Sequence, residues 1–200
     1  MRILRILVLS AVFLIAGIPP GGADESKPTT GGWKKYVNGR FGFTVQYPPE
    51  WRLGQPLADG VGITVHPPIP NSQLAVSGFL NIIEGTSQDG RQTLQEFTAA
   101  HKRIIEDAYA KKNIHLKWEQ EHLITLGGKP AVQLTFSYHD ASQAQIIELH
   151  IFSLGRNEGR GVRIKVPDSS RRTLMPTFVQ ILQTYVPGRD QDAVSPFVKP

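Results

Sequence analysis

Residues 41–51 read FGFTVQYPPEW, and this short stretch decides the fold. Apolar and polar side chains alternate over Phe43–Tyr47, which is typical of a strand with one buried face. The two prolines that follow cannot donate a ladder hydrogen bond, so the strand has to end there. We expect Tyr47, Pro48 and Trp51 to be structural anchors of this turn. The aromatic residues from position 33 to 51 are expected to pack in a core, with a ligand groove as the alternative.

Further alternating runs predict more strands on both sides of one helix. Runs at 33–37, 61–65 and 76–84 add strands to the first half of the chain. Thr93 and Glu96 have the spacing of a capping box, which predicts a helix from there to about residue 112. Its expected buried stripe has three- and four-residue spacing: Leu94, Phe97, His101, Ile104, Ile105 and Ala108. The histidine is expected at the margin of the core.

The second half of the chain predicts four antiparallel strands and a closing helix. The strands are separated by turns rich in Gly, Asp and Ser, and they fall at 114–126, 130–139, 145–154 and 161–166. The last amphipathic stretch, 174–185, predicts a helix capped by Thr173 with Pro176 in its first turn. The fold class is therefore α+β, an antiparallel sheet sandwiched between helices.

Residues 1–23 are typical of a secretory signal peptide. Arg2 and Arg5 precede an uncharged apolar run, Ile6–Ile18, and cleavage is expected after Ala23. As a helix this run would be about 20 Å long, shorter than the roughly 30 Å core of a membrane, so an uncleaved anchor is the less favoured interpretation. We predict a periplasmic or secreted protein without a stable membrane span after cleavage.

A single domain is expected between two irregular ends. Residues 24–32 predict a flexible leader, 33–186 the domain, and 187–200 an irregular tail. The chain has no cysteine, so no disulfide stabilises the domain and its stability has to come from a hydrophobic core. The net charge of +5 includes two arginines of the signal peptide. A charge this mild does not favour nucleic acid as a partner.

The order of elements and the opening motif resemble the PsbP-like superfamily, in particular its exported bacterial relatives. The resemblance rests on Tyr36–Asn38, Gly42–Pro48 and Trp51, together with the closing segment 174–185. It implies a PsbP-like α/β/α sandwich. Because members of the superfamily are chiefly non-catalytic binding or assembly factors, it also implies a role in binding a partner, and it implies no active-site residue.

The sequence carries no common catalytic motif. It has no Gly-x-Ser-x-Gly elbow, no phosphate-binding loop, no His-Glu-x-x-His and no cysteine nucleophile. We therefore predict a protein that is not an enzyme and that needs no cofactor. An extracytoplasmic hydrolase is the third interpretation, because the members of a catalytic triad can be far apart in the sequence.

A small-ligand or divalent-metal module is the alternative function. His139, Glu148 and His150 share the polar face of the predicted hairpin if His150 opposes Thr135 and Glu148 opposes Ser137. Such side chains bind Zn²⁺ or Mn²⁺ when they converge on one point. A solvated sheet face, or one covered by a helix, explains the same residues.

A group of basic residues is the preferred contact surface for a protein partner in the cell envelope. They surround the last predicted hairpin and the start of the closing helix: Arg156, Arg160, Arg163, Lys165, Arg171 and Arg172. An acidic partner would fit them, and salt would weaken its binding. A charged edge that prevents pairing with other strands explains the same residues. The first interpretation is an exported, non-catalytic accessory protein that acts through protein–protein contacts.

Overall fold

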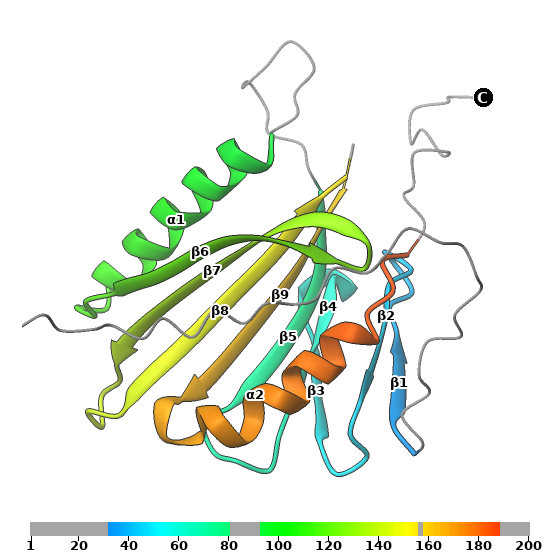
Figure 1. Ribbon diagram of the computed structural model, residues 1–200, viewed down its shortest axis with the longest axis horizontal. Helices are drawn as coiled ribbons and strands as arrows, with labels where there is room; N and C mark the ends of the chain where they lie inside the picture. The colour runs from blue at the N-terminus through cyan, green and yellow to red at the C-terminus, as the bar shows by residue number, and fades with distance from the viewer. Residues whose placement is uncertain (1–31, 81–92, 156–157, 189–200) are drawn as a thin grey trace, which may run out of the picture.

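The computed structural model describes residues 32–80, 93–155 and 158–188. Within these ranges, seven antiparallel strands form one sheet in the order β3-β4-β5-β9-β8-β7-β6, and two more form a separate pair, β1-β2 (Figure 1). The strands are β1 (Lys34–Val37), β2 (Thr44–Tyr47), β3 (Arg52–Pro56), β4 (Gly62–His66), β5 (Gln73–Leu80), β6 (Lys117–Leu126), β7 (Lys129–His139), β8 (Gln145–Leu154) and β9 (Glu158–Pro167). The helices are α1 (Leu94–Ala110) and α2 (Asp168–Gln183).

The opening stretch forms β2 and the turn after it, as expected. Tyr47 and Trp51 are only 6% and 4% exposed, and Pro48 is buried as well. The rings of Trp51 and of Phe178 on α2 meet edge to face, with their centres 5.1 Å apart. The turn is therefore held against α2, and the aromatic residues of this stretch belong to the largest core cluster.

The two helices lie on opposite faces of the large sheet. Ile147, Leu149 and Ile151 of β8 pack in the same core cluster as α2. The residues between them, Glu148 and His150, hydrogen-bond to side chains of α1. Because side chains alternate along a strand, this places α1 on one face and α2 on the other. Figure 1 shows α1 at the β6–β7 end of the sheet.

The register of the β7–β8 hairpin differs by one residue from the expected one. Phe136 opposes Glu148, and Leu134 opposes His150. The reason is the turn, which has five residues and is closed by Asp140, whose carboxylate accepts hydrogen bonds from the backbone of Ser142 and Ala144. A shift of one residue moves side chains to the other face of a sheet. Glu148 and His150 therefore lie beneath α1.

The capping box at the start of α1 is confirmed, but the expected buried stripe was partly wrong. Thr93 and Glu96 exchange the two predicted hydrogen bonds. Ile104 is 64% exposed and Ala108 is exposed as well. The side facing the sheet follows a four-residue spacing: Phe97, His101, Ile105 and Tyr109. Ile104 precedes Ile105 by about 100° around the helix, which takes it past the edge of the contact.

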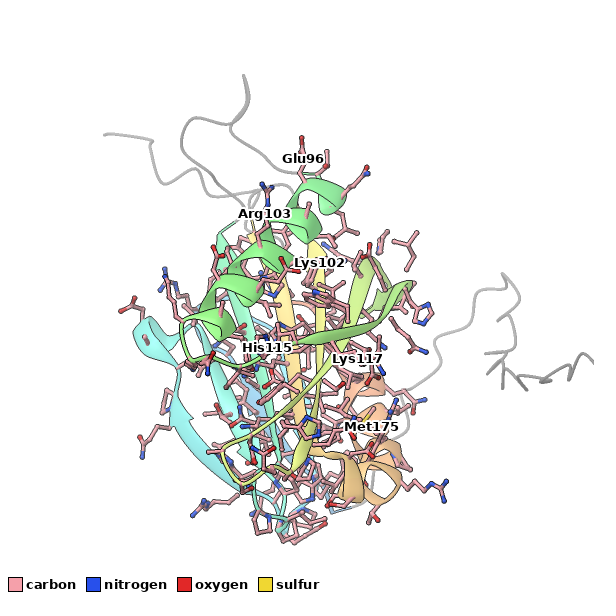
Figure 2. All side chains as sticks on the ribbon, turned by 90° about the vertical axis from the view of Figure 1, so that its left-hand side faces the viewer. Glu96, Lys102, Arg103, His115, Lys117 and Met175 are labelled. Carbon is pink, nitrogen blue, oxygen red and sulfur yellow. The ribbon has the colours of Figure 1, made fainter. Side chains whose placement is uncertain are left out.

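Glu96 and Arg103 lie on the polar outer side of α1, which faces the reader in Figure 2. Between this outer side and the sheet edge, Lys102 pairs with Glu121 of β6 at 3.2 Å. The helix α1 is therefore held to the edge strand β6 by this ion pair, and its apolar side packs on the sheet.

The closing helix is confirmed, but its predicted start was wrong. The helix α2 begins at Asp168 after Pro167, so Thr173 does not cap it and Pro176 lies in its interior. Asp168 in the first turn interacts favourably with the positive end of the helix, which accounts for the earlier start. Pro176 is exposed, so its missing hydrogen bond falls on the outer side, while Leu174, Phe178 and Ile181 are buried against the sheet.

No helix in the described ranges is long and apolar enough to cross a membrane. The predicted signal peptide and nearly all of the predicted leader lie outside these ranges, as do the end of the strand predicted at 76–84 and the tail beyond residue 188. The signal peptide thus stays a prediction.

Candidate functional site

A groove of about 600 Å³ lies beside α1, on the same face of the sheet. The helix covers the β7–β8 side of this face, where it makes its aromatic and hydrogen-bonded contacts. The groove extends from there across β9 and β5 to β4. The helix α1 therefore forms one wall of the groove, and the part of the sheet that α1 leaves uncovered forms its floor.

The floor of the groove consists of small side chains in register. Thr64 opposes Ala75, and Ser77 opposes Gly161. A Cβ added to Gly161 would meet its nearest neighbour, Ser77 Oγ, at 3.4 Å, which is ordinary contact. The hollow above Gly161 is thus a consequence of side-chain size, because larger residues at these positions would fill it.

One end of the groove is aromatic. Phe79 of β5 stacks on Phe97 of α1 with ring centres 5.0 Å apart and planes at 11°. Phe97 in turn meets the ring of Phe152 edge-on at 4.9 Å and stacks on His101 at 5.6 Å. The rings come from two strands and one helix and contact one another without a ligand. The aromatic wall is therefore preformed.

At the other end of the groove, the lining residues His150 and Arg163 contact Glu148, a carboxylate with no exposed surface. Arg163 grips it with two hydrogen bonds, 2.7 Å from Nε and 2.9 Å from Nη2. Tyr109 and Tyr138 donate their hydroxyl groups at 2.7 and 2.8 Å, and His150 Nε2 lies at 3.1 Å. A buried charge is tolerated when it is paired and hydrogen-bonded in this way.

These contacts keep Glu148 ionised. Burial alone would raise the pKa of its carboxyl group, but the hydrogen bonds from His150 and Arg163 and the charge of Arg163 outweigh burial and hold the pKa well below its usual range. Burial and the negative charge of Glu148 raise the pKa of Tyr109 to about 12. The tyrosines therefore remain hydrogen-bond donors to the carboxylate at neutral pH.

A chain of two histidines connects Glu148 to the groove. Since the carboxylate only accepts, His150 donates from Nε2, and its Nδ1 then accepts from His101 Nε2 at 3.0 Å. Burial, together with the charges of His150 and Arg163, lowers the pKa of His101 to about 4. His101 is thus neutral at neutral pH and presents Nδ1 as an acceptor.

Arg163 itself lines the groove, and its side chain is 42% exposed. Its Nε and Nη2 are occupied by Glu148 and Tyr109. No hydrogen bond of Nη1 is found within the described part of the chain, so this nitrogen is available to a ligand. Lys165 occupies the next position on the same face of β9, opposite Glu148 on one side and Gln73 on the other.

The histidine pair has no nucleophile attached to it. Within the described residues, no hydrogen bond joins a serine or threonine hydroxyl to His101 or His150, although Ser77 lines the same groove. Acyl transfer requires a nucleophile within hydrogen-bond reach of its base. The described residues therefore show no hydrogen-bonded pair of nucleophile and base at this groove.

The three predicted metal ligands are not brought together. His139 lies on the face of β7 opposite to Phe136 and Tyr138, whereas Glu148 and His150 lie beneath α1. In the ranges that the structure describes, no three His, Cys, Asp or Glu side chains are grouped so as to hold a metal ion. The one-residue register difference is the reason, because it turned two of the three residues to the other face.

The predicted basic surface is also divided. Arg160 is 5% exposed, pairs with Glu158 at 2.8 Å and donates to the carbonyl of Phe41. Arg163 and Lys165 lie on the opposite face of β9, because side chains alternate along a strand. Arg171 and Arg172 belong to the first turns of α2, and Arg156 lies outside the described residues. The members of this group that the structure describes therefore do not form one contact surface.

The residues that connect α1 to the sheet were not predicted from the sequence. Tyr109, Tyr138 and the contact between His101 and His150 were not expected. Tyr109 had a usable signal, because it continues the four-residue spacing of Phe97, His101 and Ile105. The histidine contact had none, since its two residues are far apart in the chain.

The low pKa of His101 predicts a loss of stability in mild acid. Between about pH 6.5 and 4, the unfolded chain binds a proton at His101 and the folded chain does not. The free energy of unfolding should therefore fall, as pH falls through this window, by up to about 1.4 kcal/mol per pH unit from this group. Urea denaturation at half-unit steps measures the slope.

A matched pair of variants assigns that slope to His101. His101→Phe keeps a ring beside Phe97 and Phe152 and should flatten the pH dependence. His122→Phe, on the exposed part of β6, should leave it unchanged. If His101→Phe retains the wild-type slope, the acid sensitivity arises elsewhere.

Searches with the sequence find no matching family model and no matching curated protein. The structure, however, is similar to solved structures. One is the solution structure of cyanobacterial PsbP (CyanoP) from Synechocystis sp. PCC 6803, with a TM-score of 0.59 and 12% identity, covering 84% of this chain and 98% of that one. Another is a crystal structure from Bacteroides thetaiotaomicron, with a TM-score of 0.53 and 12% identity, covering 82% of this chain and 52% of that one.

The chain is an α+β sandwich with a ligand-sized groove on one sheet face. Its fold is PsbP-like, which confirms the fold expected from the opening motif and the order of elements. At this level of identity the likeness concerns the fold alone.

Proposed function

We propose that this protein is a non-catalytic binding protein that holds a small ligand in the groove beside α1. The groove itself carries the proposal. Its volume of about 600 Å³ lies within the range of roughly 300–1,000 Å³ that is usual for ligand pockets. Like those pockets, it combines an apolar, aromatic wall with a few polar groups at fixed positions.

Preorganisation also supports binding. The aromatic wall is braced by ring contacts, and the polar end is held by the hydrogen bonds around Glu148. A site on strands and a helix loses little conformational freedom when a ligand binds, so more of the interaction energy appears as affinity. This groove replaces the divided basic residues as the preferred contact site. Action outside the cytoplasm follows from the predicted signal peptide and remains a prediction.

A groove-filling variant tests the proposal. Gly161→Val places two methyl groups above the floor, where the added Cβ meets only ordinary contacts, and valine suits a strand. Nile red, an uncharged apolar dye, is the probe, and its fluorescence reports binding. We expect wild type to bind the dye and Gly161→Val to bind it at least about tenfold more weakly.

The matched control is Gly39→Val, which adds the same side chain where no atom lies within 4 Å of the new Cβ. It should bind Nile red as wild type does. Circular dichroism melting should show both variants folded. Equal dye binding by all three folded proteins would place the dye outside the groove and overturn the proposal.

A further inference from the structure

We infer that the ligand of the groove is an anionic amphiphile, with an elongated apolar body and a singly charged carboxylate at one end. This inference rests on the proposed function and specifies the ligand class. It follows from the order in which side chains change along the groove and from the cationic donors at its polar end.

Polarity changes in one direction along the floor. On the face with α1, successive cross-strand pairs of β5 and β9 are Phe79 with Gly159, Ser77 with Gly161, Ala75 with Arg163, and Gln73 with Lys165. Pairs two residues apart are separated by roughly 7 Å, so the aromatic end and Arg163 are about 14 Å apart. A compact polar ligand would leave most of this length empty, whereas an apolar chain with one polar end would span it.

The polar end offers two cationic side chains, Arg163 and Lys165, and the carboxylate between them and α1 is already paired. Glu148 has no exposed surface and is already paired with Arg163. Arg163 Nη1 remains as a donor at the groove. Lys165 lies two residues further along the same face of β9, next to the residues that line the groove, and forms no ion pair within the described residues. Glu148 lies opposite Lys165 in the sheet, and Asp140 also interacts electrostatically with Lys165 while its carboxylate accepts hydrogen bonds within its own turn. Arg163 Nη1 and the ammonium group of Lys165 are therefore the donors that this end leaves for an anionic head group.

The available donors fit one carboxylate better than a phosphate. Glu148 occupies the Nε and Nη2 side of Arg163, and Nη2 also donates to the hydroxyl group of Tyr109 at 3.4 Å. A second anion therefore cannot form paired hydrogen bonds with Nη1 and Nη2 without displacing Tyr109. One nitrogen of Arg163 and one ammonium group are left for the head group. His101 is neutral, stacks on Phe97 and extends the apolar wall along the body of the ligand.

Decanoate and decan-1-ol form a matched pair of probes that differ in the head group. Decanoate is titrated below its micelle-forming concentration and decan-1-ol below its solubility limit, each against the protein loaded with Nile red, at neutral pH and low salt. A groove without a cationic end would favour the alcohol, because a carboxylate loses more hydration on binding. We expect decanoate to displace the dye at a concentration about tenfold lower than the alcohol, since a hydrogen bond to a charged group contributes more.

Lys165→Gln removes one charge without touching the hydrogen bonds of Glu148, and it should reduce the preference for decanoate about fivefold. Lys35→Gln on the exposed strand β1 is the control and should retain the preference. Sodium chloride should weaken the binding of decanoate and leave the binding of decan-1-ol unchanged.

The two proposals fail in different ways. Equal displacement by decanoate and decan-1-ol, or a preference that Lys165→Gln does not change, would overturn the inference that the ligand carries a carboxylate. The groove would still be a binding site. Dye binding that Gly161→Val does not weaken would instead overturn the groove, whatever the head group.

Discussion

Trp51→Ala is expected to lower the free energy of unfolding by about 3–5 kcal/mol, the usual cost of removing a large buried aromatic side chain. Trp51 is 4% exposed, and its ring and that of Phe178 on α2 meet edge to face. Its removal leaves a cavity between the turn and the helix, and the turn loses its attachment. Urea denaturation followed by circular dichroism measures the loss.

Leu53→Ala is the control for that prediction. Leu53 lies two residues further along the chain and is 41% exposed, so its truncation should cost less than about 1 kcal/mol. If Trp51→Ala were as stable as Leu53→Ala, Trp51 would not anchor the fold.

Arg163→Met is expected to cost about 3 kcal/mol at neutral pH, because it leaves Glu148 buried without its cationic partner. Removing one member of a buried pair usually costs about 3–5 kcal/mol, and the 42% exposure of Arg163 favours the lower end of that range. Without Arg163 the pKa of Glu148 should rise, so the deficit relative to wild type should shrink as the pH is lowered. Denaturation curves at neutral and acidic pH measure both effects.

A double variant measures how much of this loss comes from the pairing of Glu148 with Arg163. Glu148→Gln with Arg163→Met removes both charges, so part of the stability lost in Arg163→Met should return. Arg171→Met at the start of α2 controls for the loss of a surface arginine and should stay close to wild type. Losses that simply add in the double variant would show that Glu148 and Arg163 are not coupled.

The strands, the helices and the burial of Tyr47 and Trp51 could be predicted because their signals are local. The alternation of Phe43, Val45 and Tyr47 and the prolines after them needed no knowledge of the rest of the chain. The capping box of Thr93 and Glu96 is local in the same sense. Where local signals competed, the prediction was wrong: Thr173 resembled a helix cap, but the helix begins earlier, at Asp168.

The candidate site could not be predicted, because it depends on pairings between distant segments. The polar hairpin residues were recognised, but a single residue in the turn after His139 decides which face Glu148 and His150 occupy. Likewise, the basic residues near the last hairpin read as one cluster in sequence. Alternation along β9 sends Arg160 into the core and Arg163 to the groove.

The sequence by itself determined the alternation of side chains in the strands, the prolines that end them and the buried aromatic residues of the opening turn. These features depend on residues that are neighbours along the chain. Only the tertiary structure decided that His101 and Tyr109 of α1 meet Glu148 and His150 of β8 and Arg163 of β9. It also left small residues uncovered beside them, which is how the groove arises. The physical reason is that the strand register and the packing of the helix set which side chains share a face.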